Sequence, residues 1–198
     1  MGQTNEREII LASSSPRRQE MLRNLGLKFI IHPSGADESV DDGLKPDAIV
    51  EMLAERKAAD VASQYSEGVV IGSDTIVVLE GKVLGKPNNE KDAFSMLSSL
   101  QGTTHSVFSG LAIIDAGADK KKIGHVETKV TMRPISSDEI LRYIATKEPM
   151  DKAGSYAIQG LGSIFIEGIV GDYFSVVGLP VRLMAEYLED FGISILAP

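Results

Sequence analysis

The chain has 198 residues, of which 43% are hydrophobic and 24% are charged, as expected for a globular protein with one substantial core. Its 20 Lys and Arg residues against 28 Asp and Glu residues give a net charge of −8, which argues against a protein that coats nucleic acid. The sequence contains no cysteine, which excludes disulfides and thiolate chemistry. No apolar run approaches the ~18 residues that span a bilayer, so the cytoplasm is the expected location.

The first element is expected to be a strand that leads directly into a helix. Residues 9–12 form an apolar run that ends in three serines, after which Pro16 suits the first helical position and Ser15 the N-cap. Arg17 and Arg18 follow in the first turn, where cations oppose the helix dipole. Two interpretations stay open: these arginines and the helix N–H groups hold a phosphate, or the arginines are ordinary solvated residues.

The expected elements alternate between strands and helices, without a repeat or an obvious linker. Strands are predicted over residues 8–12, 28–32, 68–73, 105–114, 124–133, 156–158, 163–170 and 172–177, and helices over 16–25, 46–65, 89–100, 136–145 and 180–188. A turn around Gly81 predicts a hairpin that returns Lys86 toward Asp74. This mixed order predicts one α/β or α+β domain over residues 1–198, built on a mixed sheet.

Two features of the next segments allow both a functional and an ordinary interpretation. Lys57 continues the apolar stripe of Leu53 and Val61 on the helix over 46–65, so its ammonium either extends to water or points into a site. The loop over residues 33–45 is either a mobile surface loop or a source of a metal-binding carboxylate. Its acidic residues are Asp37, Glu38, Asp41 and Asp42.

Asp74 is the strongest candidate for chemistry on residue type alone. It ends a buried apolar strand, where a carboxylate is costly unless it is paired or bound to a metal. The ordinary alternative is a capping or turn aspartate. The spacing of Gly81, Gly85 and Lys86 does not make a P-loop, because one intervening residue is missing and Pro87 replaces the Ser or Thr. The serines at 13–15 lack the surroundings of a hydrolase nucleophile elbow.

The histidines and one ion pair receive weaker predictions. His32 and His125 are expected to be surface or strand residues without a role. We expect His105 to bond backbone groups at the start of a strand rather than to act as a base. Asp151 and Lys152 are interpreted as an ion pair that shapes the loop before residue 159.

Five segments, in order along the chain, resemble the Maf family of nucleoside triphosphate pyrophosphatases. They are SSSPRRQEMLRNLGLKF, IGSDTIVVLEGKVLGKP, HSVFSGLAI, EPMDKAGSYAIQG and GDYFSVVGLP. The resemblance implies an elongated, two-lobed mixed sheet flanked by helices, similar to inosine triphosphatases, with the active site in the cleft between the lobes. It also implies hydrolysis of a nucleoside triphosphate to the monophosphate and pyrophosphate, which requires an oriented water and neutralised phosphates.

The resemblance assigns roles to particular residues. It implies that Asp74 is the general base and also binds the metal, and that Glu38 lies near the metal. The expected metal is Mg²⁺ or Mn²⁺, and such an ion needs only one or two carboxylates from the protein. Phosphate binding is expected from Ser13, Arg18, Lys57 and Lys86. Base selection is expected from Arg17, Thr75 and Gln159, which match the branch of the family that prefers dTTP, UTP and modified uridine triphosphates over 7-methyl-GTP.

The family also implies a rival function, a nucleotide-binding regulator of septum formation with weak or no catalysis. A pure sensor needs the cations but not a carboxylate that activates water, so Asp74, Glu38 and Lys86 together favour the enzyme. The expected partners are a small nucleotide and a second copy of the chain in a homodimer, with neither nucleic acid nor membrane.

Overall fold

The computed structural model describes residues 7–41 and 43–196, which places Asp42 of the acidic loop outside the described residues. Its strands are β1 (Ile9–Leu11), β2 (Ile30–Ile31), β3 (Val69–Leu79), β4 (Lys82–Leu84), β5 (Thr104–Asp115), β6 (Lys120–Met132) and β7 (Ile166–Val170). They join in one sheet in the order β2-β1-β3-β5-β6-β7, with β4 paired to β3. Strand β1 runs parallel to β2 and β3, whereas the β3–β4 and β6–β7 pairs are antiparallel, so the sheet is mixed.

Six α-helices and three short 3₁₀ segments are seen in the described part of the chain. The helices are α1 (Pro16–Asn24), α2 (Pro46–Ala62), α3 (Glu90–Leu100), α4 (Ser137–Ala145), α5 (Tyr173–Val177) and α6 (Val181–Asp190). The 3₁₀ segments are η1 (Glu148–Asp151), η2 (Ala153–Ser155) and η3 (Gly160–Phe165). The predicted α/β class with a mixed sheet and flanking helices is therefore confirmed.

The chain divides into two compact units, and three strands contribute to both. Unit 1 comprises residues 1–74, 109–126 and 178–198, and unit 2 comprises residues 75–108 and 127–177. Three of the four boundaries fall within β3, β5 and β6, and the fourth follows α5. The location of the active site in a cleft between lobes and the single domain over 1–198 stay predictions.

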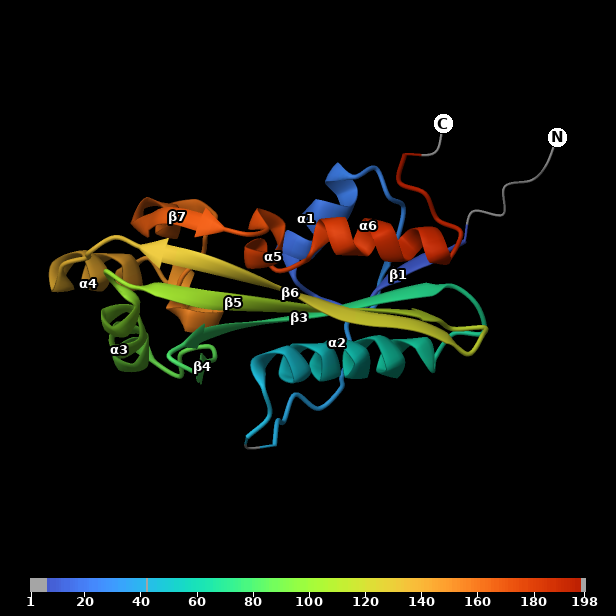
Figure 1. Ribbon diagram of the computed structural model, residues 1–198, viewed down its shortest axis with the longest axis horizontal. Coiled ribbons are helices and arrows are strands. Elements are labelled where there is room, and N and C mark those ends of the chain that lie inside the picture. Colours follow the sequence, from blue (N-terminus) through green and yellow to red (C-terminus); the bar gives the residue numbers. More distant parts are fainter. Residues whose placement is uncertain (1–6, 42, 197–198) are drawn as a thin grey trace. The chain divides into compact units, whose positions relative to one another are not determined.

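In unit 1, helices lie on both faces of the strands: α2 covers one face, and α1 and α6 lie on the other side (Figure 1). Two glycines allow α2 to approach closely. A Cβ atom on Gly72 of β3 would lie 2.4 Å from the Ala54 carbonyl oxygen, and one on Gly110 of β5 would lie 2.1 Å from the Val50 carbonyl oxygen. On the other face, Gly124 of β6 faces Tyr187 of α6. Backbone-to-backbone packing therefore fixes the distance between α2 and these strands.

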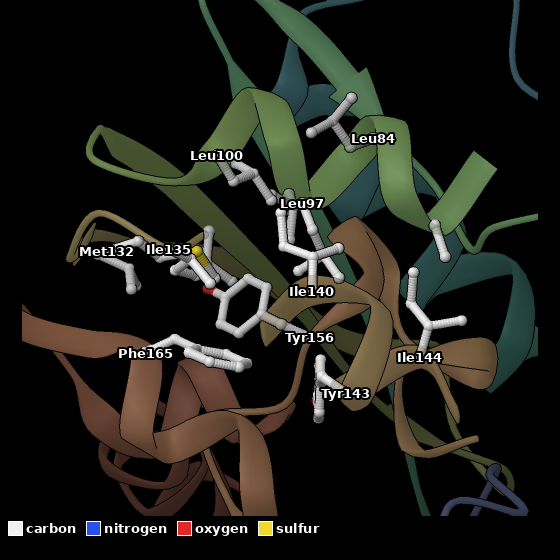
Figure 2. Packing of buried hydrophobic residues seen from close by; sticks show 14 residues of the cluster. Leu84, Leu97, Leu100, Met132, Ile135, Ile140, Tyr143, Ile144, Tyr156 and Phe165 are labelled. Carbon is white, nitrogen blue, oxygen red and sulfur yellow. The ribbon is translucent and has the colours of Figure 1, made fainter. Parts of the chain in front are cut away.

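The core of unit 2 gathers aromatic and aliphatic side chains from α3, α4 and the segments that follow α4. Figure 2 shows Tyr156 among Ile135, Ile140 and Phe165, with Leu97 of α3 above them. The rings of Tyr143 and Phe165 meet edge to face, with centroids 5.1 Å apart. This core holds the chain between α4 and β7, which includes Gln159.

Two strand predictions near the C-terminal end are wrong. Residues 172–177 form helix α5, because Asp172 accepts a hydrogen bond from the Phe174 N–H and donates its own N–H to Thr128 Oγ1, a side-chain arrangement that starts a helix. Residues 156–158 pair with no strand, since the Ala157 N–H donates to the Tyr143 hydroxyl instead. The predicted strand over 163–170 begins only at Ile166, after η3.

The strand predicted over 68–73 continues through Asp74 to Leu79, so the prediction that Asp74 ends this strand is wrong. The other elements match their predictions to within a few residues. Helix α4 begins with the capping box of Ser136 and Glu139. Strand β6 begins four residues earlier than predicted, at Lys120. Among the described residues, no helix has the length and apolar character needed to cross a membrane.

Candidate active site

One ammonium group in unit 1 lies against two carboxylates. Lys57 Nζ is 2.6 Å from Asp74 Oδ1 and 2.7 Å from Glu38 Oε1. The side chains of Lys57 and Asp74 are only 13% and 14% exposed, whereas Glu38 is 60% exposed. The alternative in which Lys57 extends its ammonium to water is therefore wrong, and the prediction that it points a cation into a site is favoured.

The alternation of β3 places Asp74 on the face that α2 covers. Val70 packs in the apolar cluster with Ala54 and Ala58 of α2, and Gly72, two residues later, meets the same helix. Because side chains two residues apart lie on the same face of a strand, Asp74 follows Gly72 toward α2, where Lys57 reaches it. The missing side chain of Gly72 thus sets the approach that makes the Lys57–Asp74 pair.

Arg18 and Ser13 form the second part of the candidate site in unit 1. Arg18 donates through Nε to the Gly178 carbonyl oxygen at 2.7 Å and through Nη1 to Ser13 Oγ at 3.3 Å. Ser13 Oγ also accepts the Ser15 N–H at 3.2 Å. The predicted N-cap position of Ser15 is confirmed, but its side chain accepts no hydrogen bond from α1. The buried Ser13 provides the local anchor instead.

The charges of this region act on Arg18 directly. Burial lowers the pKa of Arg18 most, attraction by Asp74 and Glu38 raises it, and repulsion by the half-buried Arg17 lowers it. The guanidinium nevertheless stays protonated at neutral pH. Unit 1 thus places two buried or half-buried cations, Arg18 and Lys57, and two carboxylates within electrostatic reach of one another.

Helix α2 also holds the acidic loop that carries Glu38. Arg56 donates to the Ser39 carbonyl oxygen at 2.7 Å, and Asp60 accepts hydrogen bonds from Ser34 Oγ and the Gly35 N–H. Asp37 does not join the lysine, because it accepts the Ser39 N–H at 2.9 Å within the loop. Of the acidic loop residues that the structure describes, which leave out Asp42, Glu38 is the one that forms an ion pair with Lys57.

The other predicted site residues belong to unit 2 and are described within it. The hairpin is confirmed: Val77 pairs with Leu84, and Leu79 with Lys82, around a turn at Glu80 and Gly81 that has positive φ angles. Lys86 follows β4 and is exposed, and Thr75 is half-buried in β3. Gln159 is half-buried at the N-cap position of η3. The approach of Lys86 to Asp74 stays a prediction.

Two of the weaker predictions can be compared with the structure. His105 Nε2 lies 2.7 Å from the Tyr156 hydroxyl in the core of unit 2, so the expectation that it bonds backbone groups is wrong. Burial lowers the pKa of His105 to about 4. The ion pair of Asp151 and Lys152 is confirmed.

The donor set in unit 1 is compatible with a divalent cation that also binds phosphate oxygens. The described residues contain no group of three or more His, Cys, Asp or Glu side chains arranged to hold a metal. Magnesium usually takes only one or two carboxylates from the protein and completes its shell with substrate phosphates and water. Asp74 and Glu38, which share one ammonium partner, fit such a site.

Sequence reasoning missed three residues that shape this region. Gly72 and Arg56 act through α2, and Gly178 presents its carbonyl oxygen to both Arg18 and Ser73 Oγ with a φ angle of 130°. A glycine inside an apolar strand indicates close backbone approach, so Gly72 had a detectable signal. The contacts of Arg56 with the acidic loop and of Gly178 with Arg18 and Ser73 do not follow from local sequence patterns.

Comparisons with known proteins agree on one family. Residues 8–191 match the model of a family described as Maf-like protein. A protein of Desulforamulus reducens named dTTP/UTP pyrophosphatase is 54% identical over 96% of this chain and 99% of its own length. Relatives of the same name from Pelotomaculum thermopropionicum and Moorella thermoacetica are 50% and 48% identical, over 96% and 95% of this chain and 100% and 97% of their own lengths.

Proposed function

Because this chain belongs to the Maf family, we propose that it hydrolyses nucleoside triphosphates between the α and β phosphates, with dTTP, UTP and modified uridine triphosphates as substrates. The observation that carries the proposal is the buried pair of Lys57 and Asp74, joined by Glu38. Relatives that are about half identical over nearly their whole length and are named dTTP/UTP pyrophosphatase support the substrate class.

In the proposed reaction, Asp74 accepts a proton from a water whose oxygen attacks the α phosphorus. The bond between the α phosphorus and the oxygen that bridges it to the β phosphorus breaks, and pyrophosphate leaves. Lys57 holds the Asp74 carboxylate in place before the attack, and its charge opposes the negative charge that builds up on the phosphates. Positioning and charge neutralisation account for most of the catalysis expected in such a site.

The remaining cations bind the triphosphate. Arg18 presents a planar guanidinium that Ser13 and Gly178 orient from two sides, which suits bidentate contact with phosphate oxygens. Lys86 contributes a further charge from unit 2. A Mg²⁺ or Mn²⁺ ion held by Asp74 and Glu38 would neutralise phosphate charge when bound.

Base selection is assigned to Arg17, Thr75 and Gln159. A glutamine side chain offers both a donor and an acceptor, which matches the O4 and N3–H edge of uracil or thymine. Leaving such a group unmatched once a bound base covers it costs about 1–3 kcal/mol, which is enough for ten- to hundredfold discrimination. We therefore expect UTP and dTTP to be hydrolysed well and 7-methyl-GTP poorly.

The rival function, a nucleotide-binding regulator of septum formation, is less well supported. A sensor that only binds nucleotide does not need Asp74 within the largely buried strand β3, in contact with an equally buried lysine. The location in the cytoplasm and the homodimer are further predictions of the same proposal.

Pyrophosphate release from UTP, measured with Mg²⁺ or Mn²⁺, tests the proposed function. The expected products are UMP and pyrophosphate, and Asp74→Asn should lower kcat at least about a hundredfold while the protein stays folded, since an amide cannot accept the proton. Asp138→Asn is the matched control, because its carboxylate is exposed and pairs with Arg142 on the same helix. Absence of turnover in the wild type would favour the regulator, and an Asp74→Asn variant with more than about a tenth of wild-type turnover would remove Asp74 from the base role.

A further inference from the structure

The backbone around Gln159 is held on both sides by side chains that lie outside the proposed site. Gln159 stands between a segment that leaves η2 and the short helix η3. Two residues before it, the Ala157 N–H is bonded, and two and three residues after it, the N–H groups of Leu161 and Gly162 are bonded. All of these bonds end on only two side chains.

Glu148 is the first of them. Its carboxylate accepts the Leu161 N–H at 3.0 Å and the Gly162 N–H at 2.9 Å, one on each oxygen. The Tyr143 hydroxyl donates to Oε1 at 2.8 Å. The half-buried carboxylate thus fixes the first turn of η3, at whose start Gln159 lies.

Tyr143 is the second side chain that holds the backbone around Gln159. Its hydroxyl, while it donates to Glu148, accepts the Ala157 N–H at 3.2 Å. The ring is 4% exposed and packs edge to face on Phe165 in the core of unit 2, as Figure 2 shows. Because the ring is held by the core, Tyr143 links the chain before Gln159 to the carboxylate that holds the chain after it.

The two glycines that follow Gln159 within three residues fit this arrangement closely. Gly160 has a φ angle of 76°, and a Cβ atom on it would lie 2.7 Å from Glu148 Oε2. A Cβ atom on Gly162 would lie 2.6 Å from the Tyr143 hydroxyl oxygen. The chain therefore approaches the carboxylate and the hydroxyl as closely as only glycine permits.

We propose that Glu148 and Tyr143 are positioning residues for base selection: together they fix the backbone on both sides of Gln159 and so aim its amide at the base of the substrate. This inference rests on the proposed function, in which Gln159 reads the pyrimidine. Neither residue acts on the reacting phosphates. Their effect is to reduce the number of directions in which the Gln159 amide points before the nucleotide arrives.

The charge state of Glu148 supports this role at neutral pH. Burial raises the pKa of Glu148, but hydrogen bonds from Leu161 and Gly162, the bond from Tyr143 and attraction by Lys152 lower it further, so the net shift is downward. The carboxylate stays ionised well below pH 7 and accepts all three hydrogen bonds there.

A double-mutant cycle tests the proposal through the ratio of kcat/KM for UTP to that for GTP. Gln159→Ala should lower this ratio ten- to hundredfold. Glu148→Gln keeps the shape but turns an NH₂ group toward the N–H of Leu161 or Gly162, and should lower the ratio about tenfold. In the Gln159→Ala background, Glu148→Gln should change the ratio less than twofold, because the residue through which it acts is gone.

Each outcome bears on one of the two proposals. The positioning role is refuted if Gln159→Ala lowers the UTP-to-GTP ratio and Glu148→Gln does not. It is also refuted if Glu148→Gln lowers this ratio equally in the wild-type and the Gln159→Ala backgrounds. In both cases the proposed function stands. If Gln159→Ala leaves the ratio unchanged, the role of Gln159 in base selection is refuted, and the positioning role with it. Comparing two substrates on one preparation removes the effect of any unfolded fraction.

Two further variants keep the test decisive. Tyr143→Phe removes only the hydroxyl and should lower the ratio in the same direction, and it replaces Glu148→Gln if that variant does not fold. Glu90→Gln is the matched control, because Glu90 is an exposed carboxylate of the same unit whose ion pair is with Lys147. It should leave the ratio unchanged.

Discussion

Replacing Gly72 by alanine should separate α2 from β3 and weaken the Lys57–Asp74 pair. The added Cβ would lie 2.4 Å from the Ala54 carbonyl oxygen, 2.8 Å from the Ala58 nitrogen and 2.9 Å from the Ala58 Cβ. Two of these atoms are backbone, so no side-chain rotation relieves the overlap. Ordinary contact with the Ala54 oxygen requires α2 to move away by about 1 Å, which is the scale on which overpacking a core costs about 1–3 kcal/mol.

The same shift has a consequence for activity. Lys57 Nζ and Asp74 Oδ1 are now 2.6 Å apart, and a displacement of about 1 Å would lengthen this contact beyond hydrogen-bonding distance unless the lysine side chain follows. Misplacing catalytic groups by about 1 Å costs up to about a hundredfold in rate. We expect the Gly72→Ala variant to lose about 1–3 kcal/mol of unfolding free energy and ten- to hundredfold in kcat/KM for UTP.

Urea unfolding and pyrophosphate release measure the two effects. Gly168→Ala is the matched control, because a Cβ atom on Gly168 of β7 would meet no described atom within 4 Å and its φ angle is not positive, so the unfolding free energy should change by less than about 0.5 kcal/mol. Gly110→Ala, which meets the same helix at Val50, should destabilise at least as much as Gly72→Ala. A Gly72→Ala variant as stable and active as the wild type would refute the argument that backbone contact sets the site.

Two further predictions concern buried polar groups. His105 has a pKa of about 4 in the folded state against about 6.5 when unfolded, so the stability it contributes is complete above pH 6.5 and is lost progressively as the pH falls toward 4, by roughly 3 kcal/mol in total. Urea midpoints at pH 7 and 4.5 should therefore differ less for His105→Asn than for the wild type, and equal differences would contradict the assignment. Arg18→Lys should raise the KM for UTP about tenfold, because one ammonium cannot replace the Nε and Nη1 contacts to Gly178 and Ser13. Arg142→Lys, at an exposed ion pair, should not, and equal KM values for both variants would exclude a need for the planar group.

Local patterns predicted the elements whose signals are local. Pro16 and Pro46 begin their helices, the capping box of Ser136 begins α4, and Glu80 and Gly81 turn the hairpin as expected. The apolar stripe placed Lys57 on the inward face of its helix, since helical periodicity determines which face a residue occupies, but it left open whether the ammonium reaches water or enters a site. These features depend on residues within a few positions of one another.

The predictions that were wrong concern segments whose conformation or contacts are decided by residues distant in the sequence. Residues 172–177 carry aromatic and β-branched side chains that favour a strand, but Thr128, more than forty residues earlier, binds Asp172 and starts a helix. The partner of His105 is Tyr156, 51 residues away, which no local pattern reveals. Likewise, the shared ammonium partner of Glu38 and Asp74 depends on α2, which lies between them in sequence.

The division of β3, β5 and β6 between two units has a consequence for synthesis on the ribosome. Unit 1 draws on three separate segments, and the last begins at residue 178, so its fold stays incomplete until the residues that follow Gly178 have left the exit tunnel. Until then Arg18 and Ser73 lack the Gly178 carbonyl oxygen, and the core lacks Met184 and Leu188 of α6. A nascent chain therefore cannot assemble the proposed site early, and neither unit can be excised as one uninterrupted stretch of the gene.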